Sequence, residues 1–216
     1  MIKRLIWNSK TRSLVLWLLR FFPICKGRVI CASWGGAKYN CNPRAIVEEA
    51  CRQGFGTKDK RLQFFYAFLA PSKYEKELPE GVKAIEIGSL EYYYILATSQ
   101  FIIFNIRMSG LFFPYKKKGQ KYVQTQHGGH GIKKVEFDAN LPEDYLKAAK
   151  EDTDRTDLML SDSKYWTDVY RTSYRYEGEI LEVGLPRNDI FFRPIEEKKD
   201  PDIHFAIYTP TFRNNG

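Results

Sequence analysis

Short apolar segments recur along the chain and alternate with amphipathic ones. The apolar segments are rich in β-branched and aromatic residues, which is typical of strands buried on both faces of a parallel sheet. The strands expected from this pattern are residues 28–32, 62–69, 83–87, 101–104, 158–160 and 179–183, with a further short strand at 122–125. Strands that alternate with helices predict an α/β fold, with a Rossmann-like, mostly parallel sheet and helices on both faces.

Several polar residues and glycines indicate where the helices begin and end. Asn42 and Pro43 suit the N-cap and first turn of one helix, and Gly54 suits its end. Ser163 suits the N-cap of a later helix that carries inward aromatic side chains. The acidic residues 151–157 are expected to form a link between a helix and the strand that follows.

The first 26 residues differ from the rest because they mix apolar and basic side chains. The apolar run that starts at Leu14 is interrupted by Arg20 and stops at Pro23, short of the roughly 20 residues that a spanning helix needs. Such a segment is typical of a helix that lies in the plane of a membrane surface. The alternative is a helix packed on the domain with its basic residues in solvent. The residues expected to contact the membrane are Lys3, Arg4, Trp7, Trp17, Phe21 and Phe22.

Charge is distributed unevenly along the chain, whose formal net charge is +8. Residues 1–30 hold seven of the 34 basic residues and no acid, and the other 27 basic residues stand against 26 acids. A basic arm on a nearly neutral body argues against a nucleic-acid-binding surface, which needs positive charge on the folded domain. It favours an anionic membrane surface and a peripheral position on its cytoplasmic face.

Length, composition and cysteine content indicate a folded domain in a reducing compartment. A chain of 216 residues with 44% hydrophobic and 28% charged residues can form one well-buried domain, or one domain and the start of another. Cys25, Cys31, Cys41 and Cys51 contain no C-x-x-C pair, so free thiols are expected and a zinc site is not.

The strand at 122–125 leads into a loop with candidate chemistry, Gln-His-Gly-Gly-His-Gly at 126–131. Open α/β folds bind ligands at the carboxyl ends of their parallel strands. An imidazole changes its charge near neutral pH, so His127 is a candidate catalytic base. Glycine allows a ligand close to the main chain. The backbone N–H groups of Gly128 and Gly129 are therefore candidate hydrogen-bond donors to a bound phosphate.

Two lysines follow this loop directly. Lys133 and Lys134 could stabilise the negative charge of a bound phosphate. The alternative is a strand followed by an ordinary glycine turn with lysines on the surface. The residues alone leave both interpretations open.

The segment Tyr-Val-Gln-Thr-Gln-His-Gly-Gly, followed by Lys-Lys, resembles the Q-T-W-H-G-T-x-x-K signature of the CDP-glycerol glycerophosphotransferases. These enzymes prime and extend teichoic-acid chains. Gln126 stands where tryptophan is common and Gly129 where threonine is common, whereas the histidine is kept. Further similar motifs occur in the family's order: S-x-x-G-x-x-Y-x-x-N-P-x-A-x-x-E from Ser33, L-x-S-x-S near Ser161, G-x-P-R-N-D at 184–189 and Y-A-P-T-F/W-R at 208–213.

The resemblance implies the N-terminal half of a two-domain, GT-B-like enzyme. Residues 1–26 would be the membrane-associating segment, 27–195 the acceptor-side domain, and 196–216 a linker and the first strand of a nucleotide-binding domain. The implied reaction moves glycerol phosphate from CDP-glycerol to a hydroxyl of a membrane-lipid-linked acceptor and releases CMP, with His127 taking the proton. The fragment is expected to be inactive alone. No cofactor is implied beyond the donor substrate, and a divalent metal is left open.

Other roles are compatible with some of these residues. Arg187, in the G-x-P-R-N-D motif, is a candidate phosphate ligand, and an ion pair with Asp189 is the favoured alternative. A transferase with another nucleotide-linked donor and a non-catalytic membrane-binding module are the alternative functions. A serine hydrolase lacks the G-x-S-x-G nucleophile motif, and His127, His130 and His204 lack a recognised metal-ligand spacing. The resemblance selects neither the acceptor, nor priming over polymerisation, nor an oligomeric state.

Overall fold

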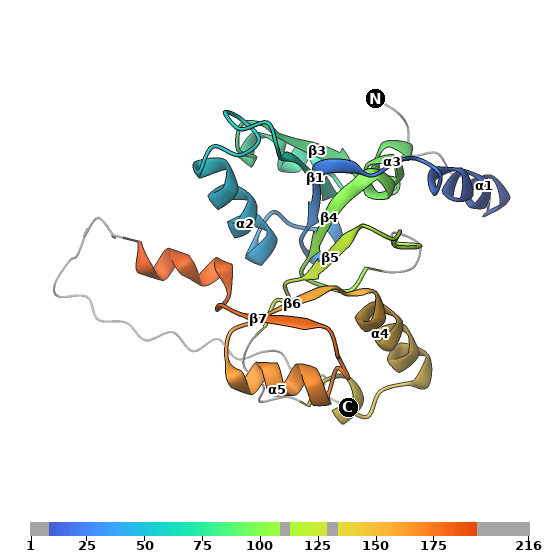
Figure 1. Cartoon of the computed structure of the whole chain (residues 1–216), viewed down its shortest axis with the longest axis vertical. Coiled ribbons are helices and arrows are strands. Elements are labelled where there is room, and N and C mark those ends of the chain that lie inside the picture. The colour runs from blue at the N-terminus through green and yellow to red at the C-terminus, as the bar shows by residue number, and fades with distance from the viewer. Residues whose placement is uncertain (1–8, 109–112, 129–133, 194–216) are drawn as a thin grey trace.

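A single parallel sheet of seven strands organises the described part of the chain (Figure 1). The computed structural model describes residues 9–108, 113–128 and 134–193. All paired strands run parallel, in the order β3-β2-β1-β4-β5-β6-β7. The strands are β1 Cys25–Ala32, β2 Gln63–Phe68, β3 Val82–Glu86, β4 Ser99–Phe104, β5 Lys121–Gln124, β6 Leu158–Ser161 and β7 Glu179–Glu182. Each overlaps a predicted strand, so the Rossmann-like α/β prediction is confirmed.

Five α-helices lie within the described residues: α1 Ser9–Leu19, α2 Cys41–Arg52, α3 Leu90–Thr98, α4 Glu143–Arg155 and α5 Lys164–Thr172. Ser163 is the N-cap of α5, as predicted, and its Oγ accepts a hydrogen bond from the Trp166 backbone N at 3.3 Å. The short 3-10 helices are η1 Trp34–Gly36, η2 Pro71–Lys73, η3 Glu75–Glu77, η4 Glu136–Asp138 and η5 Pro186–Phe192.

Two of the predicted helix boundaries are wrong. The N-cap of α2 is Asn40, and Asn42 lies inside the first turn with its side chain fully buried. The residues expected to link α4 to β6 instead continue α4 as far as Arg155. Asp152 is therefore a buried helical residue and not part of a solvated connection.

Helices cover both faces of the sheet, as predicted. Successive side chains of a strand point to opposite faces. Ile30 of β1 belongs to the core cluster that includes residues of α3, and Val15 and Leu16 of α1 pack against that cluster. Val29 belongs to the cluster that includes Val47 of α2. A third cluster joins α5 to the β6 side of the sheet. All four cysteines are free thiols, which confirms that prediction.

Because every strand runs in the same direction, all seven carboxyl ends lie at one edge of the sheet. The chain builds β1, β2 and β3 in one direction and then returns to place β4 on the other side of β1. The segments that follow β1 and β4 therefore diverge at this edge, and doubly wound folds bind their ligands at such a divergence. The segments after β1, β4 and β5 carry the residues described next.

Candidate functional site

His127 lies at this divergence, three residues beyond β5. Its Nδ1 lies 3.0 Å from the backbone oxygen of Asn105, the residue that follows β4. Its ring lies against Trp34, which follows β1, with 4.6 Å between ring centroids and 54° between planes. The side chain is partly buried and borders a cavity of about 250 Å³. The prediction that the strand places His127 at the carboxyl edge, beside open space, is confirmed.

The contact with Asn105 determines which nitrogen of His127 can act as a base. A carbonyl oxygen only accepts hydrogen bonds, so Nδ1 must carry the proton in this contact. In the neutral ring the lone pair then resides on Nε2. The geometry thus prepares one nitrogen of the ring to accept a proton.

Asn42 joins the loop of His127 to the segment that follows β7. Its Nδ2 donates to the backbone oxygens of Thr125 at 3.0 Å and Gln126 at 2.9 Å. Its Oδ1 accepts from the backbone N of Arg187 at 3.2 Å. These partners are 83 to 145 residues away in sequence, so a single fully buried side chain connects three segments.

Arg187 completes this connection. Its Nη1 donates to the backbone oxygen of His127 at 2.7 Å and lies 3.5 Å from Sγ of Cys41. The expected ion pair with Asp189 is wrong, because the guanidinium is directed to a loop 60 residues away and the Asp189 side chain is exposed. A direct contact of Arg187 with phosphate stays a prediction.

Backbone strain is concentrated at the same edge. Trp34, Cys41, Gln126 and Glu136 all have positive φ, between 46° and 62°. Only one other non-glycine residue in the described ranges, Arg175, shares this property. A left-handed conformation costs a non-glycine residue about 1–2 kcal/mol, and such strain clusters at functional sites when the surrounding contacts maintain it.

The glycines and lysines predicted to bind phosphate are only partly covered by the structure. A Cβ placed on Gly128 would meet nothing within 4 Å, so the main chain there is open to a ligand. Lys134 is exposed. Gly129 and Lys133 lie outside the described residues. The phosphate-binding roles of all four stay predictions.

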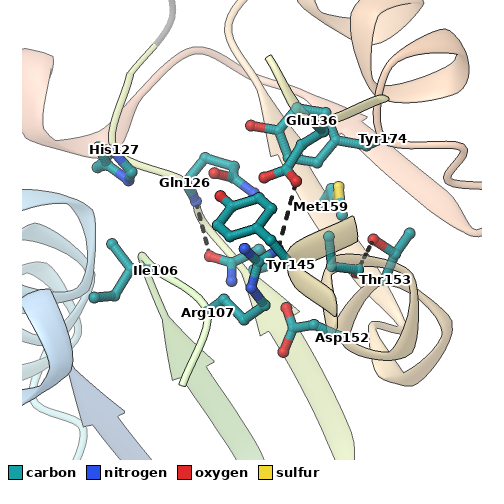
Figure 2. A pocket seen from close by; sticks show the side chains of 12 residues that line it. Ile106, Arg107, Gln126, His127, Glu136, Tyr145, Asp152, Thr153, Met159 and Tyr174 are labelled. Carbon is teal, nitrogen blue, oxygen red and sulfur yellow. Dashed lines mark hydrogen bonds and ion pairs between the residues drawn. The ribbon is translucent and has the colours of Figure 1, made fainter. Parts of the chain in front are cut away.

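The cavity beside His127 is lined mainly by polar and charged side chains (Figure 2). Figure 2 shows Arg107 and Tyr145 at the centre of the group, Glu136 above them, Asp152 below, and His127 at the edge. Oε2 of Glu136 lies 3.6 Å from Nη1 of Arg107. The Arg107 guanidinium also lies 4.5 Å from the centre of the Tyr145 ring.

A chain of hydrogen bonds connects the floor of this cavity to the histidine loop. The backbone N of Gln126 donates to Oε1 of Gln124 at 3.2 Å. Nε2 of Gln124 donates to the Tyr122 hydroxyl at 2.9 Å, and this hydroxyl lies 3.4 Å from both carboxylate oxygens of Asp152. Asp152 is 5% exposed, and its burial raises its pKa to about 6 despite the nearby positive charges of Arg155 and Arg107.

Arg107, Glu136 and Asp152 are not among the residues predicted from the sequence. Arg107 could have been found, because it follows a buried strand by three positions. Glu136 and Asp152 had no such signal. Across the residues that the structure describes, no group of three or more His, Cys, Asp or Glu side chains could hold a metal ion.

Helix α1 carries a second candidate surface. Leu19 is buried against the domain, so the alternative of a packed helix is correct for one face. Trp17, Phe21 and Phe22 remain 52%, 70% and 46% exposed. Lys3, Arg4 and Trp7 lie outside the described residues. Within the described ranges, no helix has both the length and the hydropathy to cross a bilayer.

A basic groove of about 570 Å³ lies beside this surface, lined by Arg20, Phe22, Ile24, Tyr115, Lys116, Lys117 and Lys118. Nζ of Lys117 donates to the backbone oxygen of Phe22 at 2.6 Å, which ties the lysine run to the end of α1. Apolar and basic groups therefore occur together on this part of the molecule.

Comparisons with known proteins give one consistent result. A family model described as CDP-Glycerol:Poly(glycerophosphate) glycerophosphotransferase matches residues 15–216. The teichoic acid poly(glycerol phosphate) polymerase of Bacillus spizizenii is 25% identical over 221 residues, which cover 94% of this chain and 54% of that protein. A protein of the same name from Staphylococcus epidermidis is 24% identical over 205 residues, with 87% and 27% covered. The chain spans about half the length, or less, of these curated relatives.

Solved structures of the wall teichoic acid polymerase TagF share the fold. The structure of TagF itself has a TM-score of 0.71 and 23% identity, and the match covers 84% of this chain and 45% of that one. A TagF variant soaked with CDPG has a TM-score of 0.73 and 23% identity, with 88% and 46% covered. The likeness shows that this chain shares the fold of the matched part of TagF.

Proposed function

The chain belongs to the CDP-glycerol:poly(glycerophosphate) glycerophosphotransferase family, as its motifs predict, and from this premise we propose that it is the acceptor-side part of a transferase. The proposed reaction moves glycerol phosphate from CDP-glycerol to a hydroxyl of a membrane-lipid-linked acceptor. The observation that carries the proposal is the geometry of His127, whose Nδ1 contacts a backbone oxygen while the ring borders a polar cavity.

In the proposed step, Nε2 of His127 takes the proton of the acceptor hydroxyl. The hydroxyl oxygen forms a bond to the phosphorus atom that carries glycerol, and the bond from that phosphorus to the oxygen of the cytidylyl phosphate breaks. CMP leaves with the electron pair, and the product is a phosphodiester. Proton transfer by a positioned side chain contributes about 10²- to 10⁴-fold to such a rate.

In this step, the predicted hydrogen-bond donors would stabilise the negative charge of the phosphate groups. The backbone N–H groups of Gly128 and Gly129 and the ammonium groups of Lys133 and Lys134 are proposed for this role. The open space above Gly128 supports the first part of the proposal. Residues 196–216 are proposed to begin the nucleotide-binding domain.

We also propose that α1 holds the protein on the cytoplasmic face of the membrane. Exposed Trp17, Phe21 and Phe22 beside a basic groove support this proposal. Aromatic side chains enter the interfacial region of a bilayer, whereas lysine and arginine attract anionic lipids.

The experiment that tests the reaction is a donor comparison with the full-length protein. We expect CMP release from CDP-glycerol only when an acceptor with a terminal glycerol phosphate is present. Other CDP-linked and UDP-linked donors are the alternatives, and a faster reaction with one of them would replace CDP-glycerol in the proposal. Failure to transfer from every donor would favour the non-catalytic membrane module.

A further inference from the structure

The cavity beside His127 contains charged groups whose hydrogen-bonding capacity is not fully used by the residues that the structure describes. Arg107 is largely buried, with 24% of its side chain exposed, and its ionic contact with Glu136 is 3.6 Å long. This distance exceeds that of a good hydrogen bond. A guanidinium has five N–H donors in a planar fork, so one long ionic contact and the contacts with the ring and side-chain hydroxyl of Tyr145 leave donors for a ligand.

Glu136 provides the second observation. Its Oε2 is buried, and no group in the described part of the chain forms a hydrogen bond with it. Leaving a buried acceptor without a partner costs about 1–3 kcal/mol, more when it is charged. The same residue has a φ of 46°, in the left-handed region. A buried carboxylate oxygen that has only a long ionic contact, on a strained backbone beside a candidate base, indicates a position that a ligand completes.

Asp152 adds an acceptor on the opposite side of Arg107 (Figure 2). It is nearly fully buried, and the Tyr122 hydroxyl lies at a long 3.4 Å from both of its carboxylate oxygens. The cavity therefore has a guanidinium at its centre and, on two sides, carboxylates that can accept hydrogen bonds from hydroxyl groups. Its volume of about 250 Å³ is slightly below the roughly 300–1,000 Å³ of typical ligand pockets, which suits a small polar unit.

This arrangement is complementary to a phosphorylated polyol. A guanidinium binds phosphate oxygens through charged, often bidentate hydrogen bonds, and carboxylates accept hydrogen bonds from hydroxyl groups. We propose that the cavity binds the terminal glycerol phosphate unit of the acceptor. In this proposal Arg107 contacts the phosphodiester, Glu136 accepts a hydrogen bond from the glycerol hydroxyl that does not react, and the reacting hydroxyl lies at His127.

The proposal rests on the proposed function for the identity of the acceptor, but the site can be tested without turnover. Full-length protein would be titrated calorimetrically with sn-glycerol 3-phosphate, with glycerol and with inorganic phosphate. We expect glycerol 3-phosphate to bind more tightly than either component. Arg107→Met should weaken its binding about 10- to 100-fold, as expected for loss of a charged hydrogen-bonding partner. Arg61→Met is the matched control, because that side chain is 81% exposed and pairs with Asp59.

Glu136→Gln separates recognition of the polyol from recognition of an anion, and it keeps the test valid if Arg107→Met does not fold. The substitution removes the carboxylate while keeping its shape, so Arg107 becomes freer to bind phosphate. We expect the preference for glycerol 3-phosphate over inorganic phosphate to fall. Equal binding of both anions by the wild-type protein would show an anion site only and would overturn the proposal.

Steady-state rates distinguish the acceptor from the donor, which also contains glycerol phosphate. Arg107→Met should raise the KM for the acceptor about ten-fold or more and leave the KM for CDP-glycerol within about two-fold. A rise in the KM for CDP-glycerol alone would assign the cavity to the donor and contradict the proposal. If no donor supports transfer but glycerol 3-phosphate still binds through Arg107, the site stands and the proposed reaction fails. If transfer occurs and Arg107→Met changes neither KM nor binding, the reaction stands and the site fails.

Discussion

His127 lies between two polar regions whose side chains differ in the length and the partners of their hydrogen bonds. On one side, Asn42 and Arg187 make hydrogen bonds of 2.7 to 3.2 Å to the backbone, and Arg187 also lies 3.5 Å from Sγ of Cys41. On the side of the cavity, Arg107 and Asp152 make contacts of 3.4 to 3.6 Å to other side chains. The difference indicates two roles. Groups with short hydrogen bonds hold the histidine loop in place, whereas groups with long contacts are available to bind a ligand.

The largest expected effect on the free energy of unfolding comes from removing the hydrogen bonds of Asn42. Asn42→Ala would leave the backbone oxygen of Thr125 and the backbone N–H of Arg187 without their partner, and the backbone oxygen of Gln126 with only the Thr125 hydroxyl at 3.3 Å. Because each buried unsatisfied group costs about 1–3 kcal/mol, we expect the free energy of unfolding to fall by about 3 kcal/mol or more. Urea denaturation measures this change.

Asn40→Ala is the control for this prediction. Asn40 is the N-cap of α2, but its side chain forms no capping hydrogen bond. We expect a loss of about 0.5 kcal/mol or less. Equal losses for the two variants would show that Asn42 acts only as a helix residue and not as a connection between loops.

A substitution on the cavity side should have the opposite sign. Burial raises the pKa of Asp152 to about 6, against about 3.9 in an unfolded chain. The folded state therefore holds the proton more tightly, and stability falls as the pH rises from about 4 to about 6. Asp152→Asn removes this penalty and should stabilise the protein by about 2–3 kcal/mol at pH 8, with little effect near pH 4.

Denaturation curves at several pH values test this prediction. Asp154→Asn is the matched control, since it lies in the same helix with 59% of its side chain exposed. The control should show no comparable dependence on pH. A variant Asp152→Asn that is less stable than the wild-type protein at pH 8 would assign Asp152 to the structural side of the comparison.

The smallest effect on stability is expected at α1, which serves as a reference for both regions. Trp17 and Phe21 contact each other at 5.0 Å between ring centroids and are largely exposed. Replacing both by serine should change the free energy of unfolding by no more than about 0.5 kcal/mol. We expect the same variant to lose binding to vesicles that contain phosphatidylglycerol. Unchanged sedimentation with these vesicles would refute the membrane role of α1.

The sequence was sufficient for the sheet and for the position of His127. Apolar runs report burial on both faces, and the residue after a parallel strand must lie at its carboxyl edge. The role of Asn42 could not be predicted, because an asparagine before proline equally suits an N-cap, and its partners lie 83 to 145 residues away. The ion pair predicted for Arg187 was wrong for the same reason, since the nearby carboxylate of Asp189 is the obvious partner in sequence.

The cavity could not be predicted, because helix α4, which lines it, lacks the apolar periodicity of a helix that packs on a sheet. The buried residues of α4 are Ala149, Asp152 and Thr153. An inward face with two polar residues does not produce the apolar periodicity that identifies a covering helix. In sequence, these residues look like a solvated acidic segment. The inference that they line a site depends on the three-dimensional arrangement alone.

The rate of CMP release by the full-length variant His127→Gln tests the central claim most directly, with His130→Gln as the matched loss of an imidazole from the same sequence loop. We predict that His127→Gln lowers the rate about 10²- to 10⁴-fold while the free energy of unfolding and the binding of glycerol 3-phosphate remain close to the wild-type values. His130→Gln should keep most of the activity. A rate for His127→Gln within about three-fold of the wild-type rate would contradict the assignment of this histidine as the base.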